Sequence, residues 1–168
     1  MKIGIIYYSR TGNTRIAAKK LEEKLKNKKI NVDIVEIKHT KKPCFFKAGY
    51  AAIRQKDLPI TNTNFDLKKY DILLFGAPIW AGKPAPFVKT FINKTKNSEG
   101  KKAAIFLTCS SNPDKNVNAA EIISKYLEKI NIKTIDGFFI LKMKKNQIIS
   151  GEQNIDNFIE KIIKKTMR

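Results

Sequence analysis

The chain has 168 residues, of which 42% are hydrophobic and 10% aromatic, enough to bury the core of one domain over residues 1–168. Its 34 Lys and Arg residues against 15 Asp and Glu residues give a formal net charge of +19, which favours acidic partners and nonspecific contacts with polyanions. No stretch has the roughly 18 uninterrupted apolar residues of a membrane span, and the positive charges are spread without a nucleic-acid-binding motif, so neither a membrane protein nor a specific nucleic-acid binder is expected.

The first half of the chain predicts a strand, a helix, a second strand and then a mixed segment. Lys2–Tyr8 is a nearly continuous apolar run, typical of a strand buried on both faces, and the polar residues after it end it too early for a signal peptide. Asn13–Lys28 carries its apolar residues on one helical stripe, whereas Asn31–Lys38 alternates apolar and polar residues like a strand near a sheet edge. Residues 39–64 break this rhythm, and we expect a short helix there, over the site or an edge of the sheet, that includes Phe45, Phe46, Tyr50, Ile53 and Arg54.

The second half of the chain alternates strands and helices. The predicted strands are Asp71–Gly76, Lys102–Thr108 and Lys133–Lys142. The predicted helices are Pro84–Lys94, with Pro84 or Pro86 in its first turn, Asn118–Ile130 and Gly151–Thr166. Five strands interleaved with helices predict an α/β domain, a parallel sheet with helices on both faces, in which ligands bind beyond the carboxyl ends of the strands.

The first loop at that edge is Ser9–Thr14, between the first strand and its helix. Ser9, Thr11 and Thr14 supply hydroxyl groups, Gly12 permits a tight turn, and a helix N-terminus attracts an anion. The loop lacks both the lysine of a GxxxxGK[ST] loop and the spaced glycines of a dinucleotide-binding turn. It is typical of a site for one terminal phosphate, and the alternative is an ordinary N-cap with a turn glycine.

The second loop, Gly76–Pro84 (GAPIWAGKP), contains Trp80, the only tryptophan of the chain. An aromatic side chain in a loop rich in Gly and Pro is suited to stacking on a planar ring. The alternative is a tryptophan that folds back onto the following helix.

The third loop, Thr108–Asp114 (TCSSNPD), offers small polar residues whose backbone groups suit the edge of a heterocycle, although an ordinary turn before a helix N-cap has the same composition. It includes Cys109, while Cys44 and the single histidine, His39, lie elsewhere. Without a CxxC motif or a set of zinc ligands, no metal site is expected, and both cysteines are expected as free thiols.

Together the three loops describe a ligand with one phosphate, a polar middle and a large flat ring, which fits flavin mononucleotide (FMN). The stretch SRTGNT after an apolar strand resembles the phosphate-loop signature of the flavodoxin family, [ST]-x-T-G-x-T. GAPIWAGKPAPFVKTFI resembles the second flavin loop and the following helix of flavodoxin-like proteins and of FMN-dependent quinone reductases. FFKAGYAAI resembles short flavodoxin-like members, and the resemblance extends from Lys2 to about Arg168.

The resemblance implies a flavodoxin-like three-layer sandwich of the short-chain form, with five parallel strands in the order 2-1-3-4-5. It also implies an FMN site. The FMN phosphate would be bound by Ser9, Arg10, Thr11, Gly12, Asn13 and Thr14. The ribityl chain and the ring would lie along Pro78, Ile79, Trp80, Ala81 and Gly82. The pyrimidine edge would meet Thr108, Cys109, Ser110 and Ser111.

Two functions remain open. The first is a low-potential electron carrier, a cytoplasmic monomer or weak homodimer that docks on an acidic redox protein partner. The second is an FMN-dependent NAD(P)H:quinone-type reductase, favoured because the third loop lacks an aromatic residue; this leaves one ring face open, or covered by Phe45, Phe46 or Tyr50. No catalytic acid or base is predicted, since a lone histidine such as His39 and a small cysteine such as Cys109 are more often structural.

Overall fold

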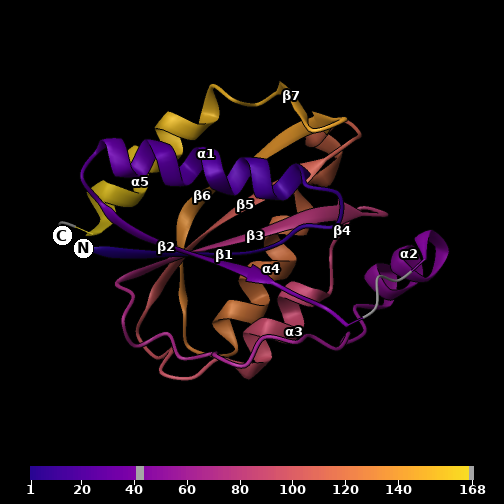
Figure 1. Cartoon of the computed structure of the whole chain (residues 1–168), viewed down its shortest axis with the longest axis horizontal. Coiled ribbons are helices and arrows are strands. Elements are labelled where there is room, and N and C mark those ends of the chain that lie inside the picture. Colours follow the sequence, from indigo (N-terminus) through magenta and orange to yellow (C-terminus); the bar gives the residue numbers. More distant parts are fainter. Residues whose placement is uncertain (41–43, 167–168) are drawn as a thin grey trace.

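Seven strands form the sheet at the centre of this computed structural model, which describes residues 1–40 and 44–166. Five of them are parallel neighbours in the order β2-β1-β3-β5-β6, which confirms the predicted order 2-1-3-4-5. Their bounds are β1 Lys2–Tyr8, β2 Asn31–Ile37, β3 Ile72–Trp80, β5 Lys102–Cys109 and β6 Lys133–Lys144. Helices cover both faces (Figure 1): α1 (Asn13–Asn27) and α5 (Asn154–Thr166) lie on one face, and α3 (Phe87–Lys94) and α4 (Asn118–Glu128) on the other.

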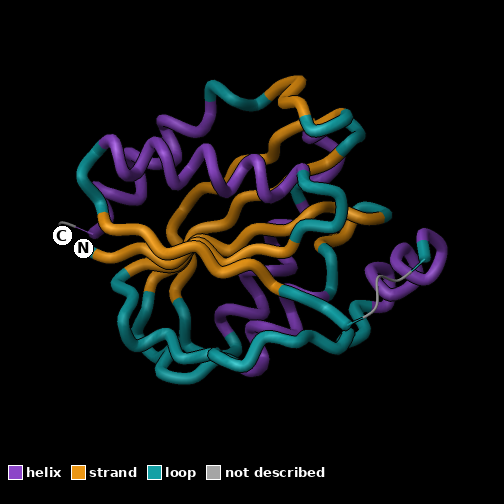
Figure 2. Tube along the Cα trace, in the orientation of Figure 1, coloured by secondary structure: helices purple, strands orange, loops and turns teal. Residues whose placement is uncertain are grey.

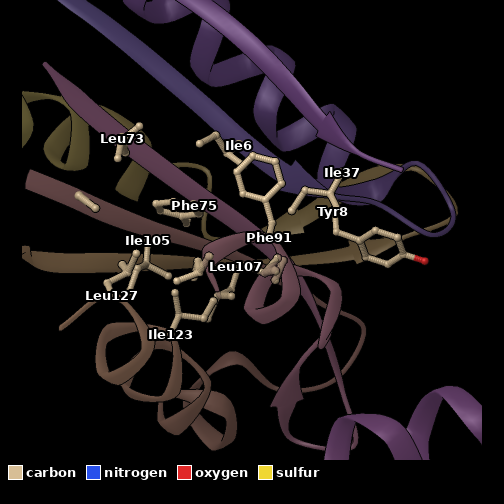
Figure 3. Close-up of a cluster of buried hydrophobic side chains, with 14 of the residues drawn as sticks. Ile6, Tyr8, Ile37, Leu73, Phe75, Phe91, Ile105, Leu107, Ile123 and Leu127 are labelled. Atoms are coloured by element: carbon tan, nitrogen blue, oxygen red, sulfur yellow. The ribbon is translucent and has the colours of Figure 1, made fainter. Parts of the chain in front are cut away.

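The strand β1 shows why its sequence is almost continuously apolar. Ile3, Ile5 and Tyr7 are buried in the cluster under α1 and α5, whereas Ile6 and Tyr8 are buried in the cluster that α3 and α4 cover. Both faces of the strand are therefore removed from water, as expected for a central parallel strand. Figure 3 shows part of the second cluster, in which Tyr8 lies at one end with its hydroxyl pointing away from the other labelled side chains.

Two short strands were missed by the sequence analysis. The strand β4 (Lys83–Pro84) forms an antiparallel hairpin with the end of β3, so Trp80 and Pro84 are strand residues. The prediction of a helix from Pro84 with Pro84 or Pro86 in its first turn was therefore wrong at its start, because Pro84 lies in β4 and Pro86 is the N-cap of the helix. The helix α3 begins only at Phe87. The strand β7 (Gln147–Ser150) forms a second hairpin with β6 around the turn Lys145–Asn146, whose φ angles are 47° and 63°.

The crossover from β2 to β3 departs from a regular βαβ unit. Its helix, α2 (Phe45–Arg54), confirms the short helix predicted there, but it stands clear of the sheet at the carboxyl end of the strands (Figure 1). The sheet face beneath this crossover is covered by loop segments instead (Figure 2). Leu67 and Tyr70 are buried there, and a Cβ at Gly4 of β1 would lie 2.9 Å from the Tyr70 ring, so only glycine admits this ring.

Two further predictions concern the state of the cysteines and membrane-spanning segments. Cys44 is exposed and Cys109 is buried, and both are free, which confirms the predicted thiols. Within residues 1–40 and 44–166, no helix combines the length and the apolar character that crossing a membrane requires.

Candidate functional site

The three loops predicted to bind a ligand lie at the carboxyl ends of β1, β3 and β5, which are neighbours in the sheet. Two contacts join them. The Thr14 and Thr108 hydroxyls share a buried hydrogen bond of 2.8 Å between the first and third loops. The Arg10 guanidinium carbon lies 5.7 Å from the centroid of the Trp80 ring, which connects the first loop to the β3–β4 hairpin. The fold thus brings residues from distant parts of the sequence to one edge of the sheet.

The first loop is arranged to receive an anion at the N-terminus of α1. The Ser9 Oγ accepts hydrogen bonds from the backbone N–H of Gly12 (3.2 Å) and of Arg15 (3.3 Å), so its own proton is directed elsewhere. Gly12, the N-cap, has φ = +100°, a conformation that glycine adopts without strain. The first turn of α1 contains no acidic residue, so no carboxylate of this turn competes with an anion for the positive end of the helix. Thr11, in the loop before this turn, is exposed.

Thr14 and Asn13 connect this loop to distant parts of the chain. Thr14 is fully buried, and its hydroxyl is engaged with that of Thr108. The Asn13 Oδ1 accepts a 3.2 Å hydrogen bond from the backbone N–H of Asn146, in the turn between β6 and β7. This hairpin therefore supports the loop from a position 133 residues away in the sequence. Sequence reasoning missed Asn146, because no glycine marks its turn.

The tryptophan is held by a tight hairpin at the end of β3. The turn residues Ala81 and Gly82 have φ angles of 49° and 74°, typical of the two-residue turns that join antiparallel strands. The Trp80 ring stands edge-on to Tyr8 (centroids 5.7 Å, 85°) and to Phe87 of α3 (6.3 Å, 88°). Trp80 therefore does contact the following helix, as the alternative interpretation expected, yet the side chain stays partly exposed.

Two neighbouring aromatic residues near Trp80, the buried Tyr8 and the partly buried His39, each contain a buried polar atom without a hydrogen bond. Among the described residues, the Tyr8 hydroxyl and the His39 Nδ1 are the buried side-chain polar atoms without a hydrogen bond. The two rings are neighbours (centroids 5.7 Å), and both pack on Phe87. Burial raises the pKa of Tyr8 to about 12, more than the nearby Arg10 lowers it, so the phenol stays protonated at neutral pH. A buried donor without an acceptor is a common feature of ligand sites.

The third loop consists mainly of small polar residues and is held in place by hydrogen bonds from Asn116. Ser110 and Ser111 are exposed. Asn116, a buried residue that the sequence analysis did not select, donates to the Ser111 Oγ (3.0 Å) and to the Asn112 carbonyl (2.6 Å). The Cys109 thiol donates to the Ser111 carbonyl, and burial raises the pKa of this thiol. The thiol is therefore a poor nucleophile at neutral pH.

The aromatic residues predicted as an alternative cover for the ring belong to α2, which stands clear of the sheet (Figure 1). The Phe46 and Tyr50 side chains of α2 are 86% and 54% exposed, and the Phe45 side chain lies outside the described part of the chain. Residues Pro78 and Ile79 lie at the end of β3 and are partly exposed. A helix N-terminus prepared for an anion, a partly exposed tryptophan and a loop of exposed serines fit a group with a phosphate at one end and a flat ring at the other. The individual contacts to such a group stay predictions.

The comparisons with known proteins agree with this geometry. The model of a protein family described as NADPH-dependent FMN reductase matches residues 1–146. Among solved structures, a flavoprotein from Lactobacillus acidophilus in complex with FMN has 24% identity and a TM-score of 0.71, over 94% of this chain and 98% of its own. An archaeal flavodoxin has 17% identity and a TM-score of 0.67 over 100% of both chains, and flavodoxin 1 from Bacillus cereus has 18% and 0.62 over 98% of both. No curated protein matches the sequence.

Proposed function

This chain belongs to the family of NADPH-dependent FMN reductases, flavodoxin-like proteins whose cofactor is FMN, and we propose that it takes electrons from NAD(P)H and passes them to a second acceptor. The FMN supplies the redox chemistry when bound, and the protein supplies binding, orientation and electrostatics. The observation that carries the proposal is the unequal pair of loops at the ring position. Trp80 stands on the β3–β4 hairpin, whereas the third loop presents Ser110 and Ser111 without an aromatic side chain.

At the phosphate end, the first loop supplies the binding groups. Ser9, Thr11 and the free N–H groups of the first turn of α1 would hold the terminal phosphate as neutral hydrogen-bond donors. The Arg10 guanidinium, placed between this loop and Trp80, adds a positive charge between the phosphate and the ring. Thr14 and Thr108 would support this loop from behind, because both are buried and their hydroxyls bind each other, and the exposed Asn146 would support it through the hydrogen bond of its backbone N–H to Asn13.

At the ring end, the hairpin and the third loop have different tasks. Trp80 would stack on one face of the ring, while the backbone of Cys109, Ser110 and Ser111 would pair with its polar edge. A face that no aromatic residue covers is accessible to the nicotinamide of NAD(P)H, and then to an acceptor. A reductase needs a site that two planar substrates can use in turn, whereas an electron carrier does not need one.

The first experiment is to purify the protein, load it with FMN and add NADPH without oxygen. We expect a yellow protein whose flavin absorbance is bleached by NADPH and returns when a quinone is added. Trp80→Ala should weaken FMN binding by about tenfold, as the loss of roughly 1.4 kcal/mol of stacking predicts. The control is Phe138→Ser, a truncation of another partly exposed aromatic side chain in the middle of β6, which should leave FMN binding unchanged. A colourless protein that does not take up added FMN contradicts the proposal.

A second candidate is a one-electron carrier that docks on an acidic redox protein, and the net charge of +19 favours it. The same sample distinguishes the two functions. A carrier is not bleached by NADPH but is reduced by a reduced iron–sulfur protein, at a rate that falls as salt rises.

A further inference from the structure

The helix α2 presents its large apolar residues to solvent. Phe46, Tyr50 and Ile53 are 86%, 54% and 57% exposed, and their spacing of four and three residues places them on one face of the helix. The small residues Ala48, Ala51 and Ala52 are buried on the other face. An amphipathic helix normally buries its large apolar side chains, so this helix buries less apolar surface than it would in the opposite orientation. Contiguous exposed apolar residues of this kind mark an interaction surface.

The helix is fixed in this orientation by the residue that ends it. The Gln55 Nε2 donates to the Pro84 carbonyl (3.0 Å), and the Gln55 Oε1 accepts from the Tyr126 hydroxyl (3.0 Å). The Gln55 carbonyl also accepts from the Lys89 Nζ (2.8 Å). These bonds attach the end of α2 to β4, α3 and α4, beside the hairpin that carries Trp80 (Figure 1). The carboxyl end of α2 therefore lies beside the hairpin proposed to hold the flavin, and the exposed stripe is on the helix face opposite the buried alanines.

The stripe is bordered by positive charges. Lys47, Arg54 and Lys56 are exposed, and the Lys56 Nζ lies 5.1 Å from the centroid of the Tyr50 ring. Between Glu36 and Asp57 the sequence contains no acidic residue. Asp57 itself forms an ion pair with Lys89 (3.2 Å). An apolar centre with a basic rim complements a partner surface that is apolar in the centre and acidic around it.

We propose that this basic face of α2, defined by Phe46, Tyr50, Ile53, Lys47, Arg54 and Lys56, is the docking surface for an acidic one-electron protein that exchanges electrons with the FMN. This rests on the proposed FMN-dependent redox function and names its protein partner. A second copy of this chain is a poor occupant, because a symmetric contact brings the same three cations together. Full reduction of the FMN to its anionic reduced form would take one electron from each of two partner molecules and one proton from solvent, and reoxidation would return the two electrons and the proton.

The probe is a reduced acidic [2Fe–2S] ferredoxin, mixed without oxygen with the FMN-loaded protein in a stopped-flow instrument. The test variant is Lys47→Glu/Arg54→Glu/Lys56→Glu, and its control is Lys28→Glu/Lys161→Glu/Lys164→Glu. The control lysines are exposed and lie on α5 and at the end of α1, away from α2 (Figure 1), and the two variants have the same net charge. At low salt we expect electron transfer to slow by at least about tenfold in the test variant and by less than about twofold in the control. Equal slowing in both variants, or no ferredoxin binding at low salt, overturns the proposal.

The apolar part of the surface is tested separately with Phe46→Ser/Ile53→Ser. This variant should bind ferredoxin about three- to tenfold more weakly, with an unchanged salt dependence and an unchanged affinity for FMN. If the substitutions weaken FMN binding instead, the stripe covers the flavin. If the parent protein is a dimer and the variant is a monomer, the stripe binds a second copy of the chain. Either result overturns the proposal. FMN uptake and bleaching by NADPH, measured first on every variant, show whether the proposed function itself fails.

Discussion

The two crossovers that leave the first two strands of the chain use their helices in opposite ways. In the first crossover, residues 9–30, α1 packs Ala17, Leu21 and Leu25 against the sheet, and its N-terminus forms the proposed phosphate site. In the second crossover, residues 38–71, α2 stands beside the sheet with its large side chains exposed, and an irregular segment covers the sheet in its place. A βαβ crossover can therefore cover the sheet with something other than its helix, which frees the helix for contact with another molecule.

The largest expected difference between the crossovers is in stability. Leu21→Ala removes a fully buried side chain from α1 and should lower the free energy of unfolding by about 3 kcal/mol. Ile53→Ser on α2 should change it by less than about 0.5 kcal/mol, because the side chain is already largely exposed. Urea unfolding followed by circular dichroism measures both values. Similar losses in the two variants would mean that the α2 stripe is buried in solution.

The next difference concerns the ligand. Gly12→Ala places a Cβ at φ = +100° and 3.1 Å from the Asn146 Oδ1, a strain of about 2 kcal/mol. We expect a loss of stability and, because the loop moves, FMN binding that is weaker by about tenfold. Gly100→Ala is the matched control: its φ is +71°, nothing lies within 4 Å of the added Cβ, and the residue follows α3 rather than β1. It should lose stability with unchanged FMN affinity, as measured by flavin fluorescence quenching.

The hydroxyl pair that joins the first crossover to the third loop should give a smaller effect. Thr108→Val leaves the Thr14 hydroxyl buried without a partner, which should lower the free energy of unfolding by about 1.5 kcal/mol. Thr14→Val/Thr108→Val removes both groups and should recover most of that loss, because a buried pair replaced by apolar groups is nearly neutral. The double-mutant cycle is completed by Thr14→Val. If the losses of the two single variants add up to the loss of the double variant, the hydrogen bond does not form in solution.

The sequence predicts the first crossover better than the second, for physical reasons. Burial on both faces makes β1 a continuous apolar run, so its bounds, Lys2–Tyr8, were predicted to the residue. The stripe on α2 indicates a helix, but an amphipathic pattern does not say whether its apolar face meets the sheet, solvent or another protein.

Within the site, the loops were predictable and their supports were not. The glycine, the hydroxyls and the tryptophan mark the loops locally. The partners that fix them lie far away: Thr14 and Thr108 are separated by 94 residues, and Asn146 reaches Asn13 from a hairpin whose turn contains no glycine. Contacts of this kind depend on register and packing, which a single sequence does not encode in a local pattern.

The smallest effect is expected where the second crossover is tied to the strands β1 and β2 by ion pairs. The Asp33 carboxylate of β2 forms ion pairs with Lys69 of the second crossover (2.7 Å) and with Lys2 of β1 (3.1 Å). Lys69, more than Lys2, lowers the pKa of Asp33, although partial burial opposes the shift. Because the pKa is lower in the folded state, this carboxylate contributes stability above its unfolded value near 3.8, and the contribution is lost as the pH falls through the folded value.

Asp33→Asn should therefore lower the free energy of unfolding by about 0.5 kcal/mol at pH 7, the size of a partly exposed ion pair. The difference from the parent protein should shrink as the pH falls below about 4 and disappear once Asp33 is protonated. Glu23→Gln, at an exposed position of α1, removes the same charge and controls for the general effect of lowering the acidic content of a strongly basic chain. Urea titrations of the three proteins at several pH values measure the difference; a constant gap between Asp33→Asn and the parent down to pH 2 would mean that the carboxylate acts by packing rather than by charge.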